Sequence, residues 1–195
     1  MSDPIETGEC STTSGRRSGE PGRVLVFTGD GKGKSTAAMG LALRSLGNHM
    51  KVAMLQFIKG KWKPGEVRAV AQLPGFEIIP LGVGFTWTKT EEHHMAALRQ
   101  AWQKTQEVIR AGQHDVVILD EINYALSSTS LPVGEVFTAA DVVALLRERP
   151  RKMHVVLTGR RAPEEIVAYA DTVTEMRLVK HAYDAGRKAA RGIEF

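Results

Sequence analysis

The chain of 195 residues has a formal net charge of +4 at neutral pH, and 43% of its residues are hydrophobic, which suffices for one full core. The basic side chains are interleaved with acidic ones and do not alternate with stacking aromatic residues, so no nucleic-acid partner is expected. The single cysteine, Cys10, excludes an internal disulfide and a thiolate metal cluster. Because neither a signal peptide nor an apolar run of about 18 residues is visible, we expect a cytoplasmic protein that binds no membrane.

The first 22 residues are rich in Ser, Thr, Gly and Pro and almost empty of large apolar side chains. Such a segment cannot bury enough surface to fold alone. We therefore expect a flexible N-terminal arm over residues 1–22, followed by a single folded domain over residues 23–195.

The segment after the arm has the sequence VLVFTGDGKGKSTAAMGLALRSL. Its apolar start predicts a strand over Val24–Thr28, and its pattern from Lys34 onwards predicts a helix. The glycines between them permit backbone angles closed to other residues and leave N–H groups free to face an anion, and the helix start adds further N–H groups. The sequence therefore predicts a site for the phosphates of a nucleoside triphosphate, formed by Gly29, Asp30, Gly31, Lys32, Gly33, Lys34, Ser35 and Thr36.

This loop departs in one respect from the general pattern G-x-x-x-x-G-K-[ST], because Thr28 stands where the first glycine is expected, and we expect a tighter cradle. Lys34 can reach the β- and γ-phosphates, and the Ser35 hydroxyl suits a hydrated magnesium ion. The alternative interpretation is a glycine-rich turn that only joins strand to helix. GKS between a strand and a helix start favours the phosphate site, although Lys32 is equally compatible with a solvated turn.

Strand and helix signals alternate along the rest of the chain. Gly47 ends the first helix, Lys51–Phe57 predicts a strand, and residues 59–87, rich in Pro and Gly, predict a loop with a short strand at Phe76–Pro80. The later elements, in chain order, are expected to be a helix from Thr90 to about Ala111 with Trp102 on its buried face, a strand at Val116–Leu119, a helix from Thr138 to about Arg149, a strand at His154–Thr158, a helix led by Pro163 and a strand at Thr172–Val179.

This alternation predicts an α/β protein with a mainly parallel central sheet covered by helices on both faces. Together with the phosphate loop, it indicates the three-layer fold of P-loop NTPases of the RecA-like type. Such sheets bind ligands beyond the carboxyl ends of their strands.

Polar residues follow the apolar strands at those ends. In VVILDE, the carboxylates of Asp120 and Glu121 follow four apolar residues, as in a Walker B strand, and can hold magnesium directly or through water. The alternatives are a helix cap or a surface acid. Arg160 follows the strand that ends at Thr158, and its guanidinium suits a phosphate group. The histidines show no zinc-ligand spacing with Cys or acidic residues.

Six segments, TGDGKGKSTAAMGLALRSLG, LQFIKG, GFTW, VVILDEINYAL, TGRRAP and VKHAYDAGRKAARGIEF, occur in this order. Together they resemble the family of ATP:corrinoid adenosyltransferases, which make the cobalt–carbon bond of adenosylcobalamin. The resemblance covers essentially everything from Val24 to Phe195. Against the usual family loop, TGNGKGKTT, Asp30 replaces Asn and adds negative charge near the phosphates, whereas Ser35 replaces Thr and keeps the magnesium hydroxyl.

The resemblance implies a transferase in which a reduced, Co(I) corrinoid attacks C5′ of ATP and expels inorganic triphosphate. ATP would lie in the cradle in an orientation reversed from that in phosphoryl-transfer enzymes. Lys34 and Arg160 would be catalytic through the leaving triphosphate, with Mg²⁺ or Mn²⁺ held by Ser35, Glu121 and Asp120. Phe85 and Trp87 of GFTW would contact the corrinoid and displace its lower axial ligand. The family further implies an external electron donor, either flavodoxin-like or a flavin, and a homodimer.

Two other classes of function stay open on the residues alone. The first is an ATPase or phosphotransferase, in which Glu121 would position an attacking water or an acceptor. The second is a nucleotide-controlled binding module without turnover. The chain lacks the guanine-reading N-K-x-D motif, which weakens the interpretation as a GTPase switch.

Overall fold

The computed structural model describes residues 19–58, 65–81, 91–129 and 132–193. Its strands are β1 (Val24–Thr28), β2 (Val52–Gln56), β3 (Phe76–Pro80), β4 (Val116–Asp120), β5 (His154–Thr158) and β6 (Thr172–Glu175). Its helices are α1 (Lys34–Leu46), α2 (Gly65–Val70), α3 (Glu91–Ala111), α4 (Ile122–Leu126), α5 (Ala139–Glu148) and α6 (Glu164–Tyr169), with short 3₁₀ turns η1 (Val133–Glu135) and η2 (Ala182–Ala185).

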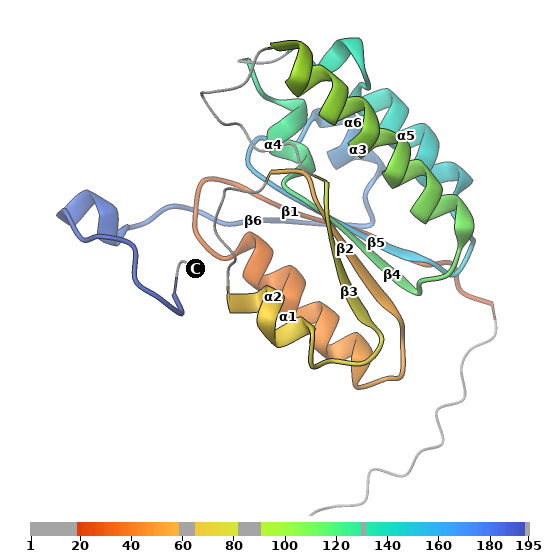
Figure 1. Ribbon diagram of the computed structural model, residues 1–195, viewed down its shortest axis with the longest axis horizontal. Coiled ribbons are helices and arrows are strands. Elements are labelled where there is room, and N and C mark those ends of the chain that lie inside the picture. Colours follow the sequence, from red (N-terminus) through yellow and green to blue (C-terminus); the bar gives the residue numbers. More distant parts are fainter. Residues whose placement is uncertain (1–18, 59–64, 82–90, 130–131, 194–195) are drawn as a thin grey trace, which may run out of the picture.

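The six strands form one sheet in the order β3-β2-β4-β5-β1-β6, and every neighbouring pair is parallel. Helices α1 and α2 cover one face of the sheet and α3 to α6 cover the other (Figure 1). This arrangement confirms the predicted three-layer α/β fold. Because all strands run the same way, their carboxyl ends meet at one edge, where a ligand site is expected.

An apolar cluster fills each side of the sheet. The strands at its centre explain this, since every residue of β2 and β4 is buried and β5 is buried beyond its first residue, as expected for strands covered on both faces. The larger cluster lies under α3 and α5, where the Trp102 ring stacks on Phe137 with ring centroids 4.6 Å apart. Trp102 is therefore a packing residue, as predicted.

Several predicted element boundaries are confirmed. The strand Phe76–Pro80 has the expected bounds, and the first helix begins at Lys34. At the start of α5, the Thr138 hydroxyl accepts a hydrogen bond from the Asp141 N–H, and the Asp141 carboxylate accepts one from the Thr138 N–H, which completes a capping box.

Two predictions about elements are wrong. Residues 65–70 form helix α2 inside the segment expected to be a loop, because Val70 is buried in the cluster under α1. The last strand ends at Glu175 and not at Val179. The neighbouring strand β1 explains this end. Glu175 is in register with Thr28, the last residue of β1, and beyond it the chain turns into the phosphate loop, so β6 has no further strand residue to pair with.

The start of the folded part is tied down at Gly22. The Gly22 N–H donates to the Arg151 carbonyl at 2.7 Å, and the Gly22 carbonyl accepts a hydrogen bond from Nη2 of Arg149 at 2.8 Å. Residues 1–18 of the expected arm lie outside the described residues, so the division at residue 22 stays a prediction. Among the helices of the described segments, none has the length and apolar character to cross a membrane.

Candidate functional site

The phosphate loop lies between β1 and α1, at the carboxyl edge of the sheet. The Lys34 side chain is only 8% exposed, and its Nζ donates hydrogen bonds to the carbonyls of Gly29 and Gly31, both at 2.7 Å. The ammonium is therefore held across the loop by carbonyl oxygens, the same kind of acceptor that phosphate oxygens would provide.

The glycines of the loop are required by its geometry. Gly29 and Gly33 have φ angles of 90° and 120°, which side chains rarely allow. Gly31 has a different reason, because a Cβ there would lie 2.6 Å from the Met176 carbonyl oxygen, to which the Gly31 N–H donates at 2.6 Å. The chain leaving β6 thus lies directly on the phosphate loop.

The Asp120 carboxylate connects three elements of the site. Its Oδ1 accepts hydrogen bonds from the Ser35 hydroxyl of α1 at 2.8 Å and from the Thr158 hydroxyl of β5 at 2.7 Å. The same Thr158 oxygen accepts the Glu121 N–H at 3.0 Å. Glu121 has a left-handed backbone with φ of 62°, so the chain turns sharply after β4 and Glu121 leaves the strand direction.

Opposite charges perturb one another inside this site. Burial, reinforced by the Asp120 carboxylate, raises the pKa of Glu121, while Lys34 and Arg160 oppose the rise. Burial lowers the pKa of Lys34, and the Glu121 carboxylate opposes this shift most. Arg160 lies nearer the surface, where its Nε is 3.8 Å from Oδ1 of Asp30. Desolvated groups of opposite charge at a strand edge are typical of a ligand site.

The side-chain oxygen atoms at this edge suit a magnesium ion that is also bound by substrate phosphates. Ser35, Asp120 and Glu121 offer only oxygen atoms, which is the preference of Mg²⁺. The described segments hold no group of three or more His, Cys, Asp or Glu side chains able to bind a metal. A hard cation bound by one or two carboxylates, a hydroxyl, water and substrate phosphates would fit here, whereas a site built of protein ligands alone is not offered.

The structure brings most of the predicted site residues to one edge. Thr36 lies exposed in the first turn of α1, and Lys32 is exposed in the loop. The residues gathered there are Gly29, Asp30, Gly31, Lys32, Gly33, Lys34, Ser35, Thr36, Asp120, Glu121 and Arg160. Phe85 and Trp87 lie outside the described residues.

Thr158 lies at this edge, as expected for the polar residue that ends the apolar strand HVVLT, and it is fully buried. Two further residues at this edge were not predicted from the sequence. Met176 reaches the phosphate loop through its backbone, for which no local pattern exists. Asn123 is fully buried two residues after Glu121, and within the described part of the chain neither amide atom has a hydrogen-bond partner.

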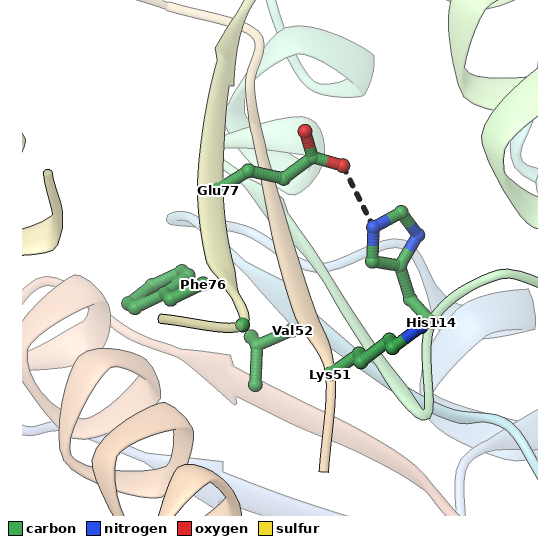
Figure 2. Close-up of a pocket in the computed structure, with 6 residues that line it drawn as sticks. Lys51, Val52, Phe76, Glu77 and His114 are labelled. Carbon is green, nitrogen blue, oxygen red and sulfur yellow. Dashed lines mark ion pairs between the residues drawn. The ribbon is translucent and has the colours of Figure 1, made fainter. Parts of the chain in front are cut away.

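A separate hollow lies at the opposite, amino-terminal edge of the sheet, where β2 and β3 begin. It is lined by Lys51, Val52, Gly75, Phe76, Glu77 and His114. Figure 2 shows the Glu77 carboxylate facing the His114 imidazole, with 2.7 Å between Oε1 and Nε2. None of the predicted site residues lines this hollow, so it is not part of the phosphate site.

The chain matches a family model described as ATP:corrinoid adenosyltransferase BtuR/CobO/CobP over residues 20–195. It is 44% identical over 177 residues to a corrinoid adenosyltransferase of Escherichia coli K12 and 42% identical over 177 residues to the corrinoid adenosyltransferase CobA of Salmonella typhimurium. Each of these alignments covers 90% of this chain and 87% of the relative.

Two solved structures share the fold at low sequence identity. The flagellar accessory protein FlaH of Methanocaldococcus jannaschii superposes with a TM-score of 0.52 at 17% identity, covering 80% of this chain and 72% of that one. A KaiC-like protein of Pyrococcus horikoshii gives a TM-score of 0.52 at 16% identity, with coverages of 83% and 75%. These likenesses support the RecA-like fold alone.

Replacing a glycine of the phosphate loop by alanine should lower stability, whereas the same replacement inside helix α1 should raise it. Gly31→Ala would place its Cβ against the Met176 carbonyl, and we expect a loss of about 1–3 kcal/mol in unfolding free energy together with weaker ATP binding. Gly40→Ala is the matched control, because nothing lies within 4 Å of its Cβ position, and it should gain about 0.5–1 kcal/mol. Thermal unfolding and ATP titration measure both effects; equal behaviour of the two variants would contradict the close packing of Met176.

Proposed function

The chain belongs to the ATP:corrinoid adenosyltransferases and transfers an adenosyl group from ATP to a corrinoid; from this premise we propose the chemistry and the residues of the transfer. The 5′-deoxyadenosyl group passes to the cobalt of a Co(I) corrinoid, and inorganic triphosphate leaves. The observation that carries this proposal is the family match over residues 20–195, which includes every strand end that forms the site.

The electron pair of Co(I) in the corrinoid substrate forms the new bond to C5′. The C5′–O5′ bond breaks, and its electron pair leaves on the triphosphate. The step balances without a proton transfer, so it requires no general base. The tasks left to the protein are to position the two substrates and to stabilise negative charge on the leaving group.

Lys34 is the first residue assigned to the leaving triphosphate. Its buried ammonium is already held by two carbonyls of the loop, which triphosphate oxygens would replace or join. A charge fixed in a desolvated site stabilises a developing anion more than the same charge in water does. Arg160 is the second, since its 3.8 Å contact with Asp30 is exposed and weak, and leaves the guanidinium available to phosphate.

Ser35, Asp120 and Glu121 would hold Mg²⁺, or Mn²⁺, on the triphosphate. A divalent cation there supplies positive charge to the leaving group. For Ser35 this means exchanging its hydrogen bond to Asp120 for a bond in which its oxygen is a ligand. The raised pKa of Glu121 supports the assignment, because a half-buried carboxylate near Asp120 gains from an added cation.

Phe85 and Trp87 are proposed to contact the corrinoid and to displace its lower axial ligand. The support is the resemblance of GFTW to the family motif, together with the place of the segment in the chain. It follows β3, whose last residue, Pro80, is in register with Gln56, which is in turn in register with Asp120. The segment therefore starts from the same edge of the sheet as the phosphate site.

Two partners complete the proposal. The transfer consumes Co(I) and provides no electron to make it, so we assign the reduction to an external donor, flavodoxin-like or a free flavin. Such donors and ATP occur in the cytoplasm, which supports a cytoplasmic location. The family resemblance supports a homodimer.

Anaerobic incubation with ATP and a reduced corrinoid tests the function. We expect the absorption spectrum of the adenosylated corrinoid and one triphosphate released for each corrinoid modified. Orthophosphate released without a change in the corrinoid would instead favour an ATPase or phosphotransferase, with Glu121 positioning the attacking group.

Loss of the Lys34 ammonium should reduce turnover strongly. Lys34→Ala removes the cation that stabilises the triphosphate, and turnover should fall by on the order of 10²-fold. Lys51→Ala, at the opposite edge of the sheet, is the matched control and should keep near-normal turnover. Near-normal product formation by Lys34→Ala would contradict the assigned role of the phosphate loop.

Removing the Glu121 charge should have opposite effects on metal use and on stability. Because its folded pKa is raised, the ionised carboxylate costs stability, which is regained as the pH falls through that pKa. Glu121→Gln should therefore raise the melting temperature at neutral pH, with a difference that shrinks in acid. The magnesium concentration that this variant needs for half-maximal turnover should rise by about tenfold or more. Glu107→Gln, on the exposed side of α3, is the control and should change neither the melting temperature nor the magnesium requirement. An unchanged magnesium titration of Glu121→Gln would contradict its role as a ligand and leave Asp120 as the next candidate.

The two aromatic residues can be tested through the oxidation state of the substrate. If Phe85 and Trp87 displace the lower ligand, Phe85→Ala and Trp87→Ala should slow adenosylation most when Co(II) must be reduced on the enzyme. With chemically reduced Co(I) corrinoid, the defect should shrink because the assisted step is bypassed. Equal losses in both assays, with a lowered melting temperature, would make the two rings packing residues.

A further inference from the structure

Exposed apolar side chains gather toward the C-terminal end of the chain. Among the described residues, eight large hydrophobic side chains are exposed, and six of these belong to α6, β6 and the residues that follow: Val167, Val173, Leu178, Val179, Tyr183 and Ile193. Val179 is 86% and Tyr183 is 78% exposed. Such a concentration is typical of an interaction surface.

Residues 177–193, called here the C-terminal segment, leave the body of the molecule. Among the strands of the described residues, β6 lies at one end of the sheet order and pairs with β1 alone. Figure 1 shows the chain continuing from β6 away from the three layers, with the short turn η2 at its far end. Hydrogen bonds inside the segment join its own residues, for example from the Gly186 N–H to the Tyr183 carbonyl and from the Arg187 N–H to the Ala182 carbonyl. The segment thus has local structure while its apolar side chains face solvent.

The charges of the segment complement those of the element before it. The segment has five basic residues against one acidic residue, Asp184; the basic ones are Arg177, Lys180, Arg187, Lys188 and Arg191. The first turn of α6 has the exposed acids Glu164 and Glu165, and Val167 of the same helix is 38% exposed. One chain therefore presents both a basic apolar surface and an acidic apolar surface.

We propose that the C-terminal segment binds a second copy of this chain, lying against α6 and the open edge of β6 of that copy. A twofold arrangement satisfies both surfaces at once, because each copy donates its segment and receives the other. It also covers the open edge of β6, whose outer backbone groups are otherwise a template for uncontrolled pairing. This inference rests on the homodimer proposed above and assigns its interface.

The interface would act on the phosphate site through Met176. This residue precedes the segment, its N–H donates to the Thr28 carbonyl at 2.8 Å, and its carbonyl accepts the Gly31 N–H. Its Sδ lies 3.2 Å from the Cβ position of Gly33, so the loop and the strand exit are in close contact. A second copy that holds the segment therefore also holds Met176 and restrains the phosphate loop.

Sedimentation velocity over a range of protein concentrations, without ATP or corrinoid, tests the interface. The full chain should dimerise, and the double variant Val179→Asp, Tyr183→Asp should weaken dimerisation at least about tenfold. Both residues are exposed, so the fold should persist, as circular dichroism would verify. Leu43→Asp is the matched control, because Leu43 is 60% exposed on α1, and it should dimerise normally. A monomeric full chain, or a dimer disrupted only by Leu43→Asp, would overturn the proposal.

A charge exchange tests the pairing of the segment with α6. A chain with Arg187→Glu and Lys188→Glu, and another with Glu164→Lys and Glu165→Lys, should each dimerise poorly because like charges meet. Mixed together they should form a heterodimer, since one contact is reversed in sign and the other is unchanged. Failure of the mixture to associate would overturn this pairing.

The link to the phosphate loop is measured with inorganic triphosphate and Mg²⁺ as the probe. The double variant should bind it on the order of fivefold more weakly than the Leu43→Asp control, as a coupling between two sites predicts. Equal affinities would overturn the link. Hydrogen exchange in which the segment is protected in a monomer would show that it folds onto its own chain, and would also overturn the interface. These measurements need no corrinoid, so their failure is distinct from failure of the adenosyl transfer.

Discussion

The site depends on one buried carboxylate that joins three elements. Asp120 is 5% exposed at the end of β4, and its Oδ1 accepts hydrogen bonds from the hydroxyl groups of Ser35 in α1 and Thr158 in β5. A buried carboxylate is tolerated only where donors compensate its lost hydration. These two donors therefore fix how α1, β4 and β5 meet, and the start of α1 in turn fixes the phosphate loop. The same oxygen atoms that hold the elements together are those that suit a magnesium ion.

The charges around this carboxylate are costly without a ligand. Burial shifts the pKa of Lys34 down and that of Glu121 up, so each group is held in an environment that disfavours its charge. A triphosphate with a divalent cation would resolve both shifts, since it adds negative charge beside Lys34 and positive charge beside Glu121. Binding would then recover the stability that these desolvated charges cost, as expected where pKa values are perturbed at a ligand site.

Local signals predicted the parts of this structure that local interactions form. The strand Val24–Thr28, the helix start at Lys34 and the capping box at Thr138 follow from residues near one another in the chain. The contact of Met176 with Gly31 joins residues far apart in the sequence, and no period or motif encodes it. The end of β6 depends on where its partner β1 turns away, and α2 depends on burial of Val70 in a cluster formed by distant strands. For Phe85 and Trp87, only the family resemblance provided a role.

The phosphate cradle alone does not determine which bond of ATP breaks. FlaH and the KaiC-like protein share the fold at 17% and 16% identity, so the sheet and its helices are a common frame. A cradle that holds a triphosphate by cations and N–H groups stabilises it whether its terminal phosphoryl group is attacked or the whole triphosphate departs from C5′. The bond that breaks is set by where the nucleophile is placed. In this chain the segment between β3 and α3 starts at the edge where β2 and β4 also end. Under the role proposed for Phe85 and Trp87, residues outside this shared frame bring the corrinoid to C5′, and alkyl transfer replaces phosphoryl transfer.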